Sequence, residues 1–158
     1  MASLAQLVNV IAPILTLPGG DAIRQTIFWP FKMVSQYARG TVLNQFGIVP
    51  QVDTCYGAAN IVQSTLVYNA AKNEMTFFAL NMEEKLPVEV CFELYDFGAT
   101  VLQKHITLRG KNLMARNSFE SPEEVVPNIV HLSPEQVARN KVLLPPLSFN
   151  MVIIRTIP

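Results

Sequence analysis

The sequence VEVCFEL at residues 88–94 decides the class of fold, because apolar and polar side chains alternate along it. Alternation puts the apolar side chains on one buried face of a strand and the others on a wet face, as in an antiparallel sheet. Similar short apolar runs, separated by turn residues, occur at residues 62–68, 75–80, 101–108, 142–144 and 151–157. Strands at this spacing predict a mainly β chain with an antiparallel β-sandwich, or jelly roll, over residues 40–158.

Residues 3–39 follow a different pattern. The apolar residues at positions 4, 7, 8 and 11 have the spacing of an amphipathic helix, and Ser3 and Gln6 stand where a capping box would start it. The run 23–28 is short and rich in β-branched and aromatic residues, as a buried parallel strand would be. Pro30 then suits the first turn of a second helix. The order helix, strand, helix is typical of an α/β fold.

One parallel strand cannot form a domain alone, because it needs neighbours on both sides and its helices need a sheet to cover. We therefore expect residues 1–39 to be the end of a longer unit, with a domain boundary between residues 39 and 40. On this interpretation Met1 is an internal methionine, exposed by truncation or by a misplaced start.

The region 111–140 lacks any strand pattern. Two stretches in it, SPEE at 121–124 and SPEQ at 133–136, each have a capping Ser, a Pro at the first helical position and an acid or amide at the third. The sequence therefore predicts single helical turns within a long loop.

Composition excludes several classes of function. Twelve Lys and Arg residues balance twelve Asp and Glu residues without forming a basic face, so we expect no nucleic acid and no anionic membrane as partner. Asn and Pro interrupt every apolar stretch before it reaches the length of a membrane span, and no basic segment precedes an export signal, which predicts a cytoplasmic protein. Cys55 and Cys91 are expected to be free thiols. His105 and His131 have no second ligand at metal spacing, so we predict surface histidines, no metal site and no cofactor.

Several blocks resemble one glycosidase family. The blocks are LAQLVNVIAPILT at 4–16, Gly19-Gly20, RQTIFWPF at 24–31, TFFALN at 76–81, NSFESPEEVVP at 117–127 and LPPLSFN at 144–150. Together they closely resemble the C-terminal part of the retaining α-L-arabinofuranosidases, which have a catalytic (β/α)8 barrel and a C-terminal jelly roll. The resemblance implies that residues 1–39 are the helix-strand-helix end of that barrel and residues 40–158 the β-sandwich. It further implies a cytoplasmic, homo-oligomeric enzyme that removes terminal α-L-arabinofuranosyl groups from plant polysaccharides and oligosaccharides.

The resemblance assigns one substrate-binding residue and two supporting residues. In the family, the amide that matches Gln25 lies at the eighth barrel strand and hydrogen-bonds the arabinofuranose, whereas the alternative for Gln25 is a strand-end amide that bonds the backbone. Arg24 and Trp29 are possible support for the site. We expect Arg24 to have a buried, charge-paired role and Trp29 to pack in a core or domain interface rather than to stack on sugar.

No catalytic residue is expected in this chain. The general acid/base and the nucleophile of the family are glutamates on the fourth and seventh barrel strands, for which this sequence has no counterpart. Retaining hydrolysis needs two carboxyl groups about 5 Å apart across the scissile bond. Asp21 is the only acid in the barrel-like segment, so we predict that the 158-residue chain is inactive alone.

Two other functions stay open from the sequence. The sandwich is a carbohydrate-binding module if solvent-facing aromatic residues form an ordered row on it, although residues 77, 78 and 92 fall within apolar runs and are expected to be buried. It is a structural or oligomerisation domain if it presents a large apolar interface patch.

Overall fold

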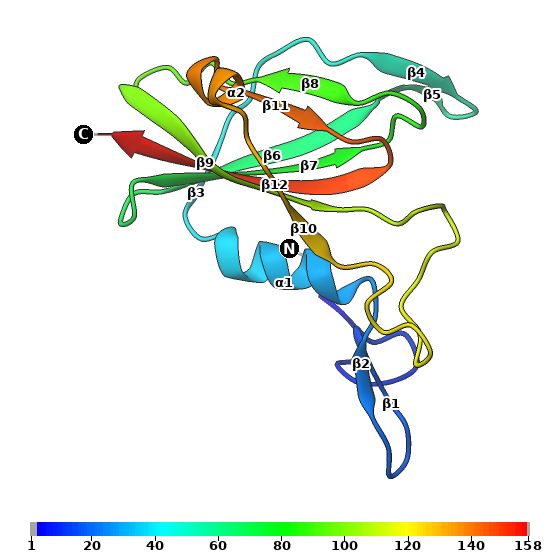
Figure 1. Cartoon of the computed structure of the whole chain (residues 1–158). Helices are drawn as coiled ribbons and strands as arrows, with labels where there is room; N and C mark the ends of the chain where they lie inside the picture. The colour runs from blue at the N-terminus through cyan, green and yellow to red at the C-terminus, as the bar shows by residue number, and fades with distance from the viewer. Residues whose placement is uncertain (1–2, 158) are drawn as a thin grey trace.

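The computed structural model describes residues 3–157 and is built around one six-stranded antiparallel sheet. Its strands lie in the spatial order β10-β9-β12-β7-β6-β3 (Figure 1). Their bounds are β3 Thr41–Leu43, β6 Val62–Asn69, β7 Glu74–Asn81, β9 Ala99–Leu108, β10 Pro127–Val130 and β12 Ser148–Ile157. The mainly β, antiparallel class expected from the sequence is confirmed.

Strand β12 lies inside the sheet and pairs along its length with β7 on one side and β9 on the other. Val152 and Ile154 belong to one apolar cluster, and Met151 and Ile153 belong to another. Both faces of the strand are therefore covered. This explains why residues 151–154 are apolar throughout instead of alternating, since a strand buried on both faces has no wet side.

Two short strand pairs lie on one side of the main sheet. Strand β8 (Val88–Cys91) pairs with β11 (Lys141–Leu144), and β4 (Gln51–Thr54) pairs with β5 (Gly57–Asn60). Figure 1 shows both pairs above the main sheet. The first core cluster joins the main sheet to β8 and β11, and consists of Val62, Leu66, Met75, Phe77, Ala79, Phe92, Leu102, Val142, Leu144, Val152 and Ile154. The sandwich is thus asymmetric, with the larger sheet facing a much smaller layer.

Helix α1 (Phe28–Tyr37) covers the opposite face of the main sheet, below it in Figure 1. Its Met33 is buried in the second core cluster, with Val67, Phe78, Leu108, Val125, Met151 and Ile153. Trp29 and Tyr37 pack against the same cluster. The helix expected around Pro30 is confirmed, and Pro30 lies in its first turn, where a missing N–H costs no helical hydrogen bond. In the described part of the chain, no helix has the length and apolar character to cross a membrane.

The expected helix over residues 4–11 is wrong, as is the parallel strand over 23–28. Residues 3–13 are irregular, and β1 (Ile14–Thr16) and β2 (Ala22–Arg24) form an antiparallel hairpin that extends away from the sheet (Figure 1). Asn9 and Val10 have φ values of 61° and 55°, which an α-helix does not allow. The Asn9 side chain instead accepts a hydrogen bond from the Thr16 backbone N–H at 2.8 Å and closes a loop onto β1.

The long loop after β9 also differs from expectation. Its residues 127–130 form β10 at the edge of the main sheet, although no alternation in the sequence marks them. The stretch beginning at Ser121 forms only turns. The stretch at Ser133 does start a short helix, α2 (Pro134–Ala138), with the predicted capping box between Ser133 and Gln136. Three short strands, β3, β4 and β5, were not predicted, because each is too short to show a period.

Candidate functional site

The residues singled out from the sequence, Arg24, Gln25 and Trp29, lie at the junction between β2 and α1. Gln25 follows the hairpin directly and is half-buried. Its side-chain Nε2 donates to the Ala12 carbonyl oxygen at 2.6 Å, and its backbone N–H donates to the Pro13 carbonyl oxygen at 2.8 Å. One N–H of the amide is therefore used to hold the side chain. Its second N–H and its Oε1 make no hydrogen bond within residues 3–157, which leaves a donor and an acceptor for a hydroxyl-rich ligand.

Arg24 and Trp29 contact each other. The guanidinium carbon of Arg24 lies 5.0 Å from the Trp29 ring centroid and 5.9 Å from that of Phe28, distances at which a cation is attracted to an aromatic face. Arg24 is exposed and forms none of the ion pairs found in residues 3–157, so the buried, charge-paired role expected for it is not present there. Trp29 packs against the second core cluster, and its buried Nε1 has no hydrogen-bond partner among the described residues.

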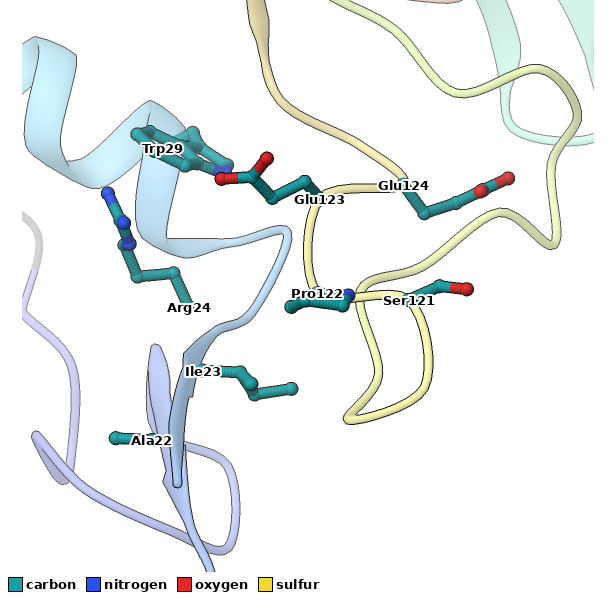
Figure 2. Close-up of a pocket in the computed structure, with 8 residues that line it drawn as sticks. All are labelled: Ala22, Ile23, Arg24, Trp29, Ser121, Pro122, Glu123 and Glu124. Atoms are coloured by element: carbon teal, nitrogen blue, oxygen red, sulfur yellow. The ribbon is translucent and has the colours of Figure 1, made fainter.

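A cavity of about 460 Å³ lies beside this junction. One wall is formed by Ala22, Ile23, Arg24 and Trp29, and the other by residues 121–124 of the long loop (Figure 2). In Figure 2 the side chain of Glu123 extends toward Trp29, whereas that of Glu124 extends away from it. Glu124 forms an ion pair with Lys111 at 2.6 Å. The two neighbouring carboxylates therefore do not face each other across a common space.

Asn117 ties the two walls together. It is buried in the long loop, and its Oδ1 accepts from the Val125 N–H at 2.7 Å while its Nδ2 donates to the Val125 carbonyl oxygen at 3.1 Å. The same Nδ2 donates to the Arg24 carbonyl oxygen at 2.9 Å, and the Asn117 backbone N–H donates to the Thr26 Oγ1 at 3.3 Å. These bonds span more than ninety residues of sequence. No local pattern marked Asn117, although it begins one of the blocks that resemble the glycosidase family.

A second cavity, of about 370 Å³, lies between α2 and the strand pair β8 and β11. Its two acids are paired with cations: Glu89 with Lys141 at 2.6 Å, and Glu135 with Arg139 at 3.3 Å. The bond to Glu89 raises the pKa of the Lys141 ammonium group. The cavity thus holds two neutralised acids rather than a pair of free carboxylates.

Residues 3–157 contain no group of three or more His, Cys, Asp or Glu residues that could hold a metal ion. Cys55 and Cys91 are exposed free thiols.

Phe77, Phe78 and Phe92 are buried, as expected. The strongly exposed aromatic residues, Phe46, Tyr56 and Tyr95, come from three separate connections between strands.

The expectation that His105 lies on the surface is wrong. His105 is on β9, has no exposed surface, and its Nε2 lies 3.0 Å from the Asn150 Oδ1. The Asn150 Nδ2 donates to the Ser148 Oγ at 2.8 Å, so the Asn150 oxygen must face His105 and the imidazole proton is assigned to Nε2. Burial lowers the pKa of His105, and the bond to Asn150 opposes this effect only in part. The half-polar strand pattern around His105 did not reveal the segments that cover it. His131 is exposed, as predicted.

Comparisons with known proteins agree on one family. Residues 1–148 match the model of the α-L-arabinofuranosidase C-terminal domain. The chain is 42% identical over 155 residues to an intracellular exo-α-(1→5)-L-arabinofuranosidase of Streptomyces lividans, covering 96% of this chain and 23% of that protein. It is 35% identical over 158 residues to an exo-α-(1→6)-L-arabinofuranosidase of Bifidobacterium longum, covering 98% of this chain and 30% of that protein.

Solved structures give the same result. A family 51 α-L-arabinofuranosidase from Bifidobacterium longum superposes with a TM-score of 0.83 at 29% identity, over 96% of this chain and 29% of that one. An α-L-arabinofuranosidase from Thermotoga maritima, solved with arabinose, superposes with a TM-score of 0.72 at 15% identity, over 94% and 32%, and shows likeness of fold. The chain therefore spans between a fifth and a third of the length of each of these relatives.

Proposed function

This chain belongs to the family of α-L-arabinofuranosidase C-terminal domains, and we propose that it serves a glycoside hydrolase that removes terminal α-L-arabinofuranosyl residues. The agreement of the family match over residues 1–148 with the fold of a family 51 enzyme carries the proposal. The two relatives are named for different linkages, 1→5 and 1→6, so the proposal extends to the terminal sugar and not to its linkage. A hydrolase family gives no support to the sandwich as a separate carbohydrate-binding module.

The two glutamates that a retaining mechanism requires are proposed to lie outside these 158 residues. Within residues 3–157, the acids that line the two cavities support this: Glu89, Glu124 and Glu135 are in ion pairs, and Glu123 has no second carboxylate facing it in Figure 2. A retaining pair would instead face each other about 5 Å apart, with one carboxyl group protonated and the other ionised.

In the complete enzyme, residues 1–39 are proposed to be the last part of the catalytic barrel and residues 40–158 the β-sandwich. Gln25 is proposed to donate and accept hydrogen bonds at the arabinofuranosyl subsite, with Arg24 and Trp29 as support. Its bond to the Ala12 carbonyl oxygen holds the amide while Oε1 and one N–H stay available. An uncharged amide suits the site, because it does not add charge next to a developing oxocarbenium ion. By analogy with the intracellular relative, the enzyme is proposed to be cytoplasmic, and it is proposed to be a homo-oligomer.

The test compares the 158-residue chain with the complete protein that contains it, on an aryl α-L-arabinofuranoside. We expect turnover by the complete protein and none by the chain alone, because the chain lacks the carboxylates that lower the barrier. Proton NMR of the first product should show the α anomer, which is the sign of retention. Turnover by the purified chain at an ordinary glycosidase rate would place the catalytic groups inside it and overturn the proposal.

Gln25 is tested by replacement with Ala in the complete protein. Loss of a hydrogen-bond partner for a buried sugar oxygen costs about 1 to 3 kcal/mol, which is roughly a ten- to hundred-fold loss in kcat/KM. Because Gln25 also bonds Ala12, the melting temperature is the necessary control. Unchanged kinetics with an intact fold would remove Gln25 from the subsite.

A further inference from the structure

The hydrogen bonds found in residues 3–157 between the long loop after β9 and the segment that carries Gln25 all come from one residue, Asn117. Asn117, 6% exposed, bonds the residues on both sides of Gln25: its Nδ2 to the Arg24 carbonyl oxygen and its backbone N–H to the Thr26 Oγ1. Within residues 3–157, Gln25 itself is hydrogen-bonded to Ala12, Pro13 and Phe28, the last of which is the first residue of α1. The long loop of the sandwich therefore reaches Gln25 through the two residues that flank it.

The Asn117 amide is held in one orientation before it reaches Arg24. Its Oδ1 accepts from the Val125 N–H and its Nδ2 donates to the Val125 carbonyl oxygen, so a flipped amide would lose both bonds. Val125 is buried in the second core cluster between the main sheet and α1. Asn117 thus joins the Arg24 backbone and the Thr26 side chain to a point fixed in the core of the sandwich.

The hairpin before Gln25 needs such a link. Strands β1 and β2 have three residues each, and in the described part of the chain they pair only with each other, apart from one bridge between Val8 and Ile14. A two-stranded hairpin is marginally stable in water. Without Asn117, the segment 24–26 would lose two of the hydrogen bonds that hold it between this hairpin and α1. A misplacement of about 1 Å in a binding group can cost about a hundred-fold in rate.

We propose that Asn117 is a positioning residue for Gln25, through which the β-sandwich sets the geometry of the arabinofuranosyl subsite without touching the sugar. This inference rests on the proposed function of Gln25. It gives the sandwich a part in the reaction, because the loop of one region holds the binding residue of the other. The link requires a side chain that has an acceptor and a donor on one planar group. The acceptor bonds the Val125 N–H, and the donor bonds the carbonyl oxygens of Val125 and Arg24.

The test is a double-mutant cycle in the complete enzyme, with Asn117→Ala and Gln25→Ala. We expect Asn117→Ala to lower kcat/KM about ten-fold in the wild-type background, with part of the loss in kcat, and less than about two-fold when Gln25 is already Ala. A general loss of structure would lower both backgrounds by the same factor. Equal losses in the two backgrounds, or unchanged kinetics in a folded Asn117→Ala protein, would overturn the inference. An inactive wild-type enzyme would instead overturn the proposed function.

Asn81→Ala is the matched control. Asn81 is a fully buried asparagine that donates to the Leu144 and Pro145 carbonyl oxygens, and those residues are remote in sequence from Gln25. It should lower the melting temperature and leave kcat/KM unchanged.

If Asn117→Ala does not fold, Thr26→Val provides the same cycle, since it removes only the acceptor for the Asn117 N–H. Thr26→Val should lower kcat/KM about two- to five-fold, and this loss should also disappear when Gln25 is Ala. An equal loss of kcat/KM in both backgrounds would overturn the inference.

Hydrogen exchange on the 158-residue chain gives a readout that needs no activity. The Gln25 backbone N–H donates to the Pro13 carbonyl oxygen, and the Phe28 backbone N–H donates to the Gln25 carbonyl oxygen. Both amide protons should exchange about ten-fold faster in Asn117→Ala than in the wild-type chain, and at the wild-type rate in Asn81→Ala. Unchanged exchange at both amides in Asn117→Ala would show that Asn117 does not hold the segment.

Discussion

The β-sandwich and the N-terminal arm, residues 3–27, contain the same kinds of apolar residues but bury them to very different extents. Met75, Val152 and Ile154 have no exposed surface, whereas Leu7 and Ile11 are 68% and 64% exposed. The sandwich closes its core with its own strands and α1, whereas the arm buries Ala12, Pro13 and Ile23 but leaves the stripe of Leu7 and Ile11 uncovered by residues 3–157. An apolar stripe therefore predicts an amphipathic element only where a second surface is available to cover it.

The same comparison applies to the two capping boxes. Ser133 and Gln136 form both expected hydrogen bonds at the start of α2, which packs against β11 and β9. Ser3 and Gln6 have the same spacing, yet no helix follows them. A cap stabilises a helix that packing already favours, and contributes too little to form one alone.

The largest expected difference between the sandwich and the arm is the stability that each loses when one of its apolar side chains is truncated to Ala. Phe77→Ala should lower the free energy of unfolding by about 3 to 5 kcal/mol, because it removes a buried ring that stacks edge-on with Phe92 at 5.0 Å. Ile11→Ala in the arm should change it by less than about 0.5 kcal/mol. Urea unfolding of both variants of the 158-residue chain measures the difference. A loss at Ile11 similar to that at Phe77 would mean that the arm is packed in solution.

Deletion of residues 1–39 tests the proposed domain boundary. The first core cluster contains none of these residues, so the remaining chain should still unfold cooperatively. It should lose about 2 to 4 kcal/mol, because α1 no longer covers the second cluster with Met33 and Trp29. Deletion of residues 1–26 alone, which keeps α1, is the control and should cost less. A non-cooperative transition after the longer deletion would move the boundary to the N-terminal side of α1.

Acid should weaken the sandwich through His105. Burial lowers the pKa of His105 in the folded chain below its unfolded value of about 6.5, so the unfolded chain binds more protons as the pH falls. The contribution of His105 to the free energy of unfolding is fully present above pH ~6.5 and decreases as the pH falls below this value. The slope for one proton is at most about 1.4 kcal/mol per pH unit, and it ends where the folded histidine also protonates. Unfolding between pH 7.5 and 5 should show this slope.

The His105→Gln variant should show a flatter profile over the same range, because glutamine does not titrate. His131→Gln, at an exposed position, is the matched control and should keep the wild-type slope. Glu83 and Glu120 have lowered pKa values, but as carboxyl groups they lose their effect only at more acidic pH. A wild-type slope in His105→Gln would assign the acid sensitivity to another group.

The smallest expected difference lies between the two caps. Ser133→Ala should lower the free energy of unfolding by about 1 kcal/mol, since it removes the acceptor for the Gln136 N–H at 3.2 Å. Ser3→Ala should have no measurable effect, because no helix begins there. Thermal melts of the two variants side by side provide the measurement. A destabilised Ser3→Ala would indicate that the helix over residues 4–11 forms in solution.

The sequence alone was sufficient to predict structural features that depend on residues close together in the chain. Alternation identified strand β8, short apolar runs between turn residues identified β6, β7, β9, β11 and β12, and the short pattern at Ser133 identified the start of α2. These features form because the pleat of a strand and the first turn of a helix impose their periods on adjacent positions. The blocks that resemble the arabinofuranosidases were also readable in the chain, and the family they indicated is confirmed.

Only the tertiary structure decided which surfaces are covered and which distant residues meet. It left the stripe of Leu7 and Ile11 exposed, buried His105 beside Asn150, and placed Asn117 between Arg24 and Thr26. None of these outcomes has a local signal, because burial depends on what lies opposite a side chain, and a bond across more than ninety residues leaves no period in the sequence. The sequence thus determined the longer strands and the family, whereas long-range packing determined how the segment with Gln25 is held.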